Sequence, residues 1–101
     1  MLLYLKSKKN TYDAVCDYDG KKYILKKGAL IRKTNEDAKV TKKVLVLRND
    51  KSIVDEKNIL KKDIEFKSST TAAQFVLCQS VNGNKVWKNE EGIKLSDTIK
   101  K

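Results

Sequence analysis

The side chains that could support catalysis or hold a metal are few and lie far apart in the sequence. There is no histidine, which removes the most common general base and metal ligand of proteins. Cys16 and Cys78 have no CxxC partner, so they cannot by themselves form a structural zinc site. The sequence therefore predicts no enzyme, no cofactor and no metal site. A small enzyme stays an alternative only if the fold forms a cleft around a strongly perturbed titratable group.

Positive charge is the feature that favours binding. The chain has 23 Lys and Arg against 13 Asp and Glu, a formal net charge of +10. Between Lys21 and Arg48, ten basic residues face only Glu36 and Asp37, so this window holds +8 of that charge. Such a field attracts polyanions, although charge alone does not distinguish DNA, RNA and an anionic membrane. A lysine-rich surface that serves solubility is the alternative. The candidate phosphate contacts in the window are Arg32, Lys33, Lys39, Lys42, Lys43 and Arg48.

Two polar segments outside this window add further candidates. Ser69 and Thr70 stand where a helix is expected to begin, and the free N–H groups of a helix start suit a phosphate. Ordinary capping of the helix by hydroxyls is the alternative. Asparagine side chains can read base edges, and an exposed indole can stack on a base, whereas a buried tryptophan would anchor the core. The second segment contains Asn82, Asn84, Lys85, Trp87 and Lys88.

The clearest element near these candidates is a hairpin. Asp19-Gly20 is typical of a two-residue type I′ turn. The register set by that turn pairs Asp17 with Lys22 and Asp13 with Lys26 on one face, and it buries the apolar residues of both strands on the other. The two lysines would then be partly neutralised, which makes them poor phosphate contacts.

Hydrophobic periodicity predicts the other elements. A helix is expected over 38–49, with Val40, Val44 and Leu47 on its buried face, although residues 44–47 are also strand-like. A second helix is expected over 70–80, with a buried stripe of Ala72, Ala73, Val76, Leu77 and Ser80. Strands are expected over 2–6, 29–33 after a bend at Gly28, 58–66 and 86–88, with a turn or chain end at Asn82-Gly83, and 93–99 fits helix or strand. The expected fold class is α+β: a small antiparallel sheet built from hairpins with two packed helices, in one domain over residues 1–101.

The C-terminal half carries a pattern that resembles a bacterial and archaeal domain family of unknown function. Residues 66–77 read FKSSTTAAQFVL and residues 80–88 read SVNGNKVWK, similar to the family's combination of SxSxAA, NG and WK. The hairpin region up to Arg32 also resembles the family's first hairpin. The chain departs from the pattern at Cys78, where a glycine is usual, at Ala29, where a serine is common, and at Thr70, which takes the second serine position.

Members of that family often form the C-terminal part of longer proteins, including ones with GIY-YIG nuclease domains, and the pattern is similar to domains associated with restriction and modification enzymes. The resemblance implies an accessory DNA-binding module. No GIY-YIG motif occurs in the chain, so no nuclease activity is implied.

The expected function is non-catalytic binding of nucleic acid, with double-stranded DNA favoured over RNA. The alternative is a protein-interaction or structural domain that orients a catalytic partner domain. The chain has no apolar run of membrane-spanning length and no signal-peptide pattern. A cytoplasmic location with reduced thiols is therefore expected.

Overall fold

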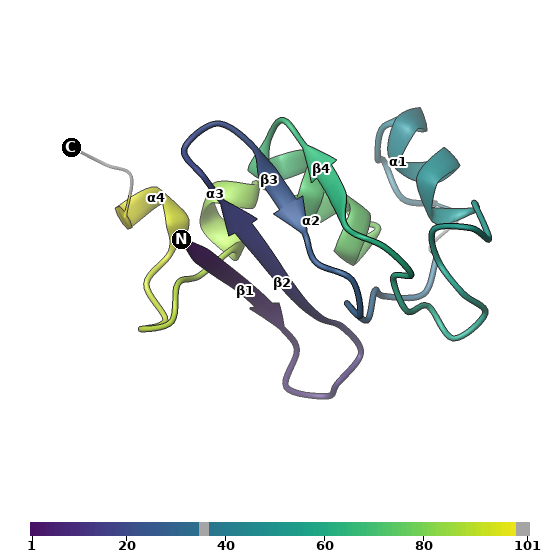
Figure 1. Ribbon diagram of the computed structural model, residues 1–101, viewed down its shortest axis with the longest axis horizontal. Helices are drawn as coiled ribbons and strands as arrows, with labels where there is room; N and C mark the ends of the chain where they lie inside the picture. Colours follow the sequence, from purple (N-terminus) through teal and green to yellow (C-terminus); the bar gives the residue numbers. More distant parts are fainter. Residues whose placement is uncertain (35–36, 99–101) are drawn as a thin grey trace.

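Three strands, a helix, a fourth strand and three further short helices follow one another in the computed structural model, which describes residues 1–34 and 37–98 (Figure 1). The strands form one antiparallel sheet in the order β1-β2-β3-β4, which confirms the expected α+β class. The strands are β1 (Leu2–Lys6), β2 (Asp13–Tyr18), β3 (Tyr23–Leu25) and β4 (Ile64–Phe66). The helices are α1 (Lys42–Arg48), α2 (Ser69–Leu77), α3 (Gly83–Val86) and α4 (Leu95–Thr98).

The helices lie on one side of the sheet, and the core fills the space between them and the strands (Figure 1). Alternation along the strands sends every second side chain into this core. Leu3 pairs with Cys16 and Cys16 pairs with Leu25, and all three are fully buried. The helices add Phe75 and other apolar residues, and Trp87 joins them from the end of α3. The opposite face of the sheet carries no helix within the described residues (Figure 1).

The predicted β2–β3 hairpin forms, but its register differs from the predicted one by two residues. Tyr18 pairs with Tyr23, which leaves a loop from Asp19 to Lys22 in place of a two-residue turn. The Asp19 carboxylate accepts hydrogen bonds of 2.8 Å from the backbone N–H groups of Lys21 and Lys22, which stabilises the wider loop. A shift of two keeps each side chain on its predicted face, but the predicted cross-strand ion pairs are wrong.

The first predicted helix is confirmed with a later start. Helix α1 begins after Thr41, whose side chain accepts a hydrogen bond from the Val44 N–H. Val44 is fully buried, and Val40 and Leu47 pack partly buried against the core. The strand-like alternative for residues 44–47 is therefore wrong, because the spacing of these apolar residues fits a helical face.

The second predicted helix is confirmed but ends earlier than expected. Helix α2 stops at Leu77 because Cys78 adopts the left-handed conformation, with φ 49° and ψ 48°. Ala72, Ala73 and the other residues of the predicted stripe are buried, but Ser80 is exposed beyond the helix end.

The predicted short strands are only partly present. Gly28 bends the chain with φ 93°, and in the segment 29–33 only Leu30 forms bridges, to Asp13 and Ile59. In the segment 58–66, bridges at residues 59 and 60 precede the short strand β4.

The C-terminal segment differs most from the prediction. Asn82 caps α3, so Asn82-Gly83 begins a helical turn, and the predicted strand 86–88 is reduced to bridges from Lys88 to Tyr4 and Lys94. In the segment 93–99, Lys94 forms a bridge and residues 95–98 form α4, while Ile99 lies outside the described residues. Within the described ranges, no helix is long and apolar enough to cross a membrane.

Candidate nucleic-acid interface

Arg48, predicted as a phosphate contact, lies in the core instead. Only 6% of it is exposed, and its guanidinium donates hydrogen bonds to the backbone carbonyls of Phe75 and Arg32. The Phe75 carbonyl belongs to the last turn of α2, where carbonyls lack helical partners. Residue 48 lies one helical turn after the buried Val44 and so on the same face, which is the reason that this prediction was wrong. Arg48 therefore joins α1 to the end of α2.

Ser69 and Thr70 use their hydroxyls to hold α3. Ser69 donates a hydrogen bond to the side-chain oxygen of Asn84, and the Thr70 hydroxyl accepts one from the Gly83 N–H at 3.1 Å. A Cβ atom on Gly83 would lie 2.2 Å from the Ser69 carbonyl carbon, so the backbone of α3 closes over this helix start. The predicted phosphate site at Ser69 and Thr70 is therefore wrong, because α3 occupies the space and the hydroxyls that it needs.

Trp87 is fully buried, so the predicted stacking of an exposed indole on a base is also wrong. Its Nε1 donates a hydrogen bond of 3.0 Å to the Ser69 carbonyl. Asn82 is exposed, but its side-chain oxygen accepts the Asn84 N–H at 3.0 Å and caps α3. Asn82 and Asn84 were predicted to approach a nucleic-acid groove. Their side-chain oxygens instead accept hydrogen bonds within α3 and from Ser69 of α2.

A basic groove of about 410 Å³ lies near the β1–β2 loop. Its cations, Arg32, Lys33 and Lys57, are all exposed, and no carboxylate lines it. Leu30 and the buried Ile31 supply an apolar part. The complete lining is Asn10, Thr11, Leu30, Ile31, Arg32, Lys33, Lys57 and Asn58.

Two tight turns place the asparagine side chains of the basic groove. Asn10 and Asn58 have φ values of 56° and 63°, in the left-handed region that Asn adopts more readily than most residues with a side chain. The Asn58 carbonyl accepts the Ile31 N–H at 2.9 Å, which fixes one wall of the groove. Amides at this position can donate to and accept from a base edge.

The end of α2 positions the other wall. The Arg32 N–H donates to the Val76 carbonyl at 2.8 Å, and the Arg32 guanidinium donates to the Gln79 side chain, also at 2.8 Å. Lys33 and Lys57 form no ion pair with any residue that the structure describes. Their ammonium groups are therefore available to an anion.

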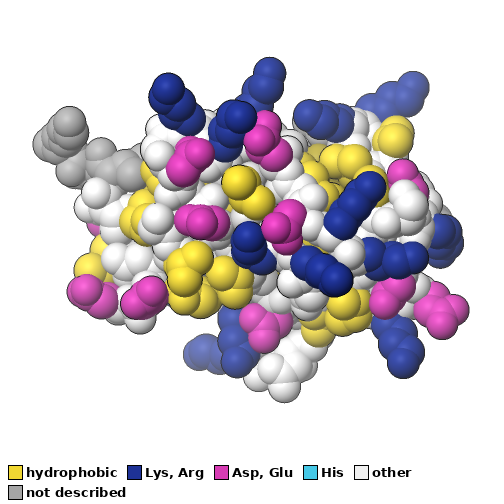
Figure 2. Space-filling view, viewed as in Figure 1, with side chains coloured by type: hydrophobic (Ala, Val, Ile, Leu, Met, Phe, Trp, Pro, Cys, Tyr) yellow, Lys and Arg dark blue, Asp and Glu magenta, His cyan; other side chains and the backbone are white. Residues whose placement is uncertain are grey.

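The uncovered face of the sheet has a different character. Lysines and carboxylates alternate across it, with apolar side chains between them (Figure 2). Lys22 lies 3.3 Å from Glu65, and Lys26 lies 3.1 Å from Asp63. Both lysines are thus paired, as predicted, but with partners on or next to β4. The Lys27 N–H, and after it the Lys26 side chain, hydrogen-bonds the Asp63 carboxylate and lowers its pKa below the ordinary 3.8.

The exposed basic residues of the predicted site lie in three separate places. Arg32 and Lys33 line the basic groove, and Lys39, Lys42 and Lys43 are exposed before and on α1. Lys85 and Lys88 are exposed at a separate pocket beside β1. The basic groove also uses Asn10, Lys57 and Asn58, which sequence reasoning missed because no spacing pattern links them to residues 30–33.

The sequence matches a known protein family. The family described as domain of unknown function (DUF4357) matches residues 3–99, from β1 to the end of α4.

The chain belongs to the DUF4357 family. No curated protein and no solved structure matches it. In this DUF4357 chain, the residues that carried the sequence resemblance, among them Ser69, Gly83 and Trp87, dock α3 onto α2. The expected membership in a family of unknown function is confirmed.

Proposed function

We propose that this DUF4357 chain is a non-catalytic nucleic-acid-binding module, with double-stranded DNA as its ligand. The basic groove is the observation that carries the proposal. Its three exposed cations are of the type that contacts phosphates, and its two asparagines are of the type that reads base edges. The exposed Lys8 and Lys9 at the tip of the β1–β2 loop extend the positive charge next to it.

The charges on the rest of the surface also favour the basic groove as the site that contacts DNA. On the uncovered sheet face, Lys22 and Lys26 are held by carboxylates, so a polyanion gains less there than at the unpaired Lys33 and Lys57. The exposed Lys42 and Lys43 on α1 add further charge. We expect the module in the cytoplasm, and by the sequence resemblance it would accompany nuclease or restriction–modification proteins.

The first test is binding of a labelled DNA duplex, measured by fluorescence anisotropy at several salt concentrations. The affinity of the natural protein should fall linearly with salt on a double-logarithmic plot. The groove variant Lys33→Gln/Lys57→Gln should bind about tenfold more weakly, and its salt slope should be smaller by about 2, because it loses two phosphate contacts.

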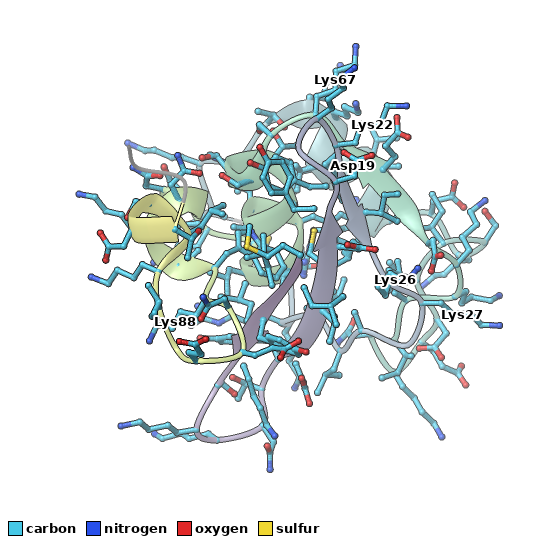
Figure 3. All side chains as sticks on the ribbon, turned by 60° about the vertical axis from the view of Figure 1, so that its left-hand side comes forward. Asp19, Lys22, Lys26, Lys27, Lys67 and Lys88 are labelled. Atoms are coloured by element: carbon cyan, nitrogen blue, oxygen red, sulfur yellow. The ribbon has the colours of Figure 1, made fainter. Side chains whose placement is uncertain are left out.

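The matched control is Lys22→Gln/Lys67→Gln, which has the same charge change. Lys22 and Lys67 lie together at the β2–β3 loop (Figure 3), at the other end of β2 from the groove. The control should keep an affinity within about twofold of the natural protein. Equal losses in both variants would mean that only net charge matters, and no binding at low salt would overturn the proposal.

The uncovered sheet face supports a second candidate function, that of a domain that orients a catalytic partner. Leu2, Tyr4, Val15 and Ile24 are exposed or half-buried on this face. A protein partner seated there would show little salt dependence. Replacing Val15 and Ile24 with Thr would weaken such a partner and leave DNA binding unchanged.

A further inference from the structure

The pocket beside β1 brings Lys6 together with three lysines of the C-terminal segment. It has a volume of about 290 Å³ and lies between β1, α3 and the loop that leads to α4. The pocket shares no lining residue with the basic groove, so the two sites are distinct. Its polar lining is Tyr4, Lys6, Tyr12, Lys85, Lys88 and Lys94.

Two of these lysines are held opposite each other. Lys88 bridges Tyr4 on one side, through hydrogen bonds of 2.7 and 3.1 Å, and Lys94 on the other. Directly opposed residues in antiparallel pairs have neighbouring side chains, and like charges at such positions are destabilising. The fold therefore keeps an unfavourable pair of charges at this pocket, which an anion between them would relieve.

No carboxylate lines the pocket, and Lys6, Lys85, Lys88 and Lys94 form no ion pair with a residue in the described ranges. Asp13 lies opposite Lys6 in the β1–β2 register but is not part of the pocket lining. The salt bridges of the described residues use Asp17, Asp63 and Glu65, none of which lines the pocket. The local field therefore favours an anionic ligand.

The remaining lining is aromatic and apolar. Tyr4 and Tyr12 are half-buried, and Leu5, Leu77 and Val86 complete the walls. A ligand that fits both the aromatic walls and the lysines of this pocket has a flat, π-rich group next to the tyrosines and a phosphate next to the lysines. The volume is at the small end of ligand pockets, which run from about 300 Å³ upward. It therefore suits a single unpaired nucleotide and not a base pair.

We propose that this pocket binds a single unpaired nucleotide, with its base against Tyr4 or Tyr12 and its phosphate between Lys88 and Lys94. The inference deepens the proposed function: the nucleotide is either free or the unpaired end of a nucleic acid held by the basic groove. The shared chemistry is a 5′-phosphate next to an aromatic base.

The test is an NMR titration of the full chain with 5′-dAMP, with deoxyadenosine and with inorganic phosphate. Addition of 5′-dAMP should saturably shift the amides of Lys85, Lys88 and Lys94. Deoxyadenosine and phosphate alone should bind at least tenfold more weakly, because each fills half of the pocket. Shifts that appear at the basic groove instead, or equal binding of phosphate alone, would overturn the inference.

Two double variants test whether 5′-dAMP binding depends on the pocket lysines or only on net charge. Lys88→Gln/Lys94→Gln should bind 5′-dAMP at least tenfold more weakly, whereas Lys22→Gln/Lys67→Gln, with the same charge change, should bind it as the natural protein does. The pocket variant should also melt at the same or a higher temperature at low salt, since it loses the opposed charges. A lower melting temperature would mean that these lysines stabilise the fold, against the argument made from their repulsion.

Duplexes with and without a one-nucleotide overhang distinguish the two sources of the nucleotide. If the ligand is a strand end, the overhang should raise affinity about tenfold, and the pocket variant should lose this gain while keeping its affinity for the blunt duplex. If the overhang has no effect but 5′-dAMP binds, the ligand is a free nucleotide. If no duplex binds while 5′-dAMP still shifts the pocket amides, the proposed function fails and the pocket assignment stands.

Discussion

Cys78 occupies the position at which α2 ends. Its φ of 49° lies in the left-handed region, where a side chain costs about 1–2 kcal/mol and glycine costs little. Its N–H donates to the Gln74 carbonyl at 2.8 Å, which closes the last turn of the helix. The resembling family usually has glycine here, and the left-handed backbone gives a physical reason for that preference.

Two substitutions at this position isolate the backbone cost. Cys78→Gly and Cys78→Ala both remove the thiol, but only alanine keeps a Cβ in the left-handed conformation. The glycine variant should be more stable by about 1 kcal/mol, which corresponds to about 4–8 °C in Tm for a domain of this size. Urea unfolding of the pair provides the measurement, and an alanine variant of equal or greater stability would contradict it.

At the scale of elements, α3 depends on its fit against the start of α2. Gly83 is buried, and a Cβ there would lie 2.2 Å from both the carbon and the oxygen of the Ser69 carbonyl. These are backbone atoms, which cannot turn aside as the end of a side chain can. The contact also holds Trp87, whose indole N–H donates a hydrogen bond to the same Ser69 carbonyl.

Gly83→Ala should therefore separate α3 from α2 and expose the only tryptophan. We expect a loss of about 2–3 kcal/mol in unfolding free energy from overpacking and a red shift of the Trp87 emission in the folded state. Gly20→Ala is the control, since Gly20 has φ 98° but nothing within 4 Å of an added Cβ. The control should lose some stability through backbone strain, with no change in emission. An unshifted emission in Gly83→Ala would refute the proposed role of the close contact.

At the scale of the whole molecule, several carboxylates hold loops by accepting hydrogen bonds from backbone N–H groups. The Asp19 carboxylate accepts from Lys22 and Lys21, and that of Asp55 accepts from Ile59 and Lys57. These hydrogen bonds lower both pKa values below the ordinary 3.8. Serine and lysine contacts have the same effect on the pKa values of Asp50 and Asp63.

Stability should consequently fall as the solution becomes acidic. A carboxyl whose pKa is lower in the folded state stabilises the fold above its unfolded pKa, and this contribution disappears as pH falls through the folded value. The unfolding free energy should be near its maximum above about pH 5 and decrease below pH 4. Urea titrations from pH 2.5 to pH 6 measure this. Asp55→Asn should be less stable than the natural protein at pH 6, and the difference should shrink as the pH falls toward 2.5. A constant difference between them would argue against the linkage.

Local patterns predicted much of the fold and little of the candidate site. Apolar spacing identified the face of α1 and the buried stripe of α2, because helical periodicity depends only on neighbouring residues. The same local reasoning failed at Arg48, since sequence spacing does not show that the Phe75 carbonyl needs a donor. It also failed at Ser69, whose partner Asn84 lies 15 residues away.

The sequence by itself determined the α+β class, the inward faces of the strands and helices, the absence of histidine chemistry and the large positive charge. These properties follow from composition and from periods of 2 and 3.6 residues, which act over a few residues. Only the tertiary structure decided the hairpin register, the burial of Trp87 and the choice of cations that face solvent without a partner. Those outcomes depend on contacts between segments far apart in the chain, such as Ile31 with Asn58, and no local pattern encodes which distant groups will meet.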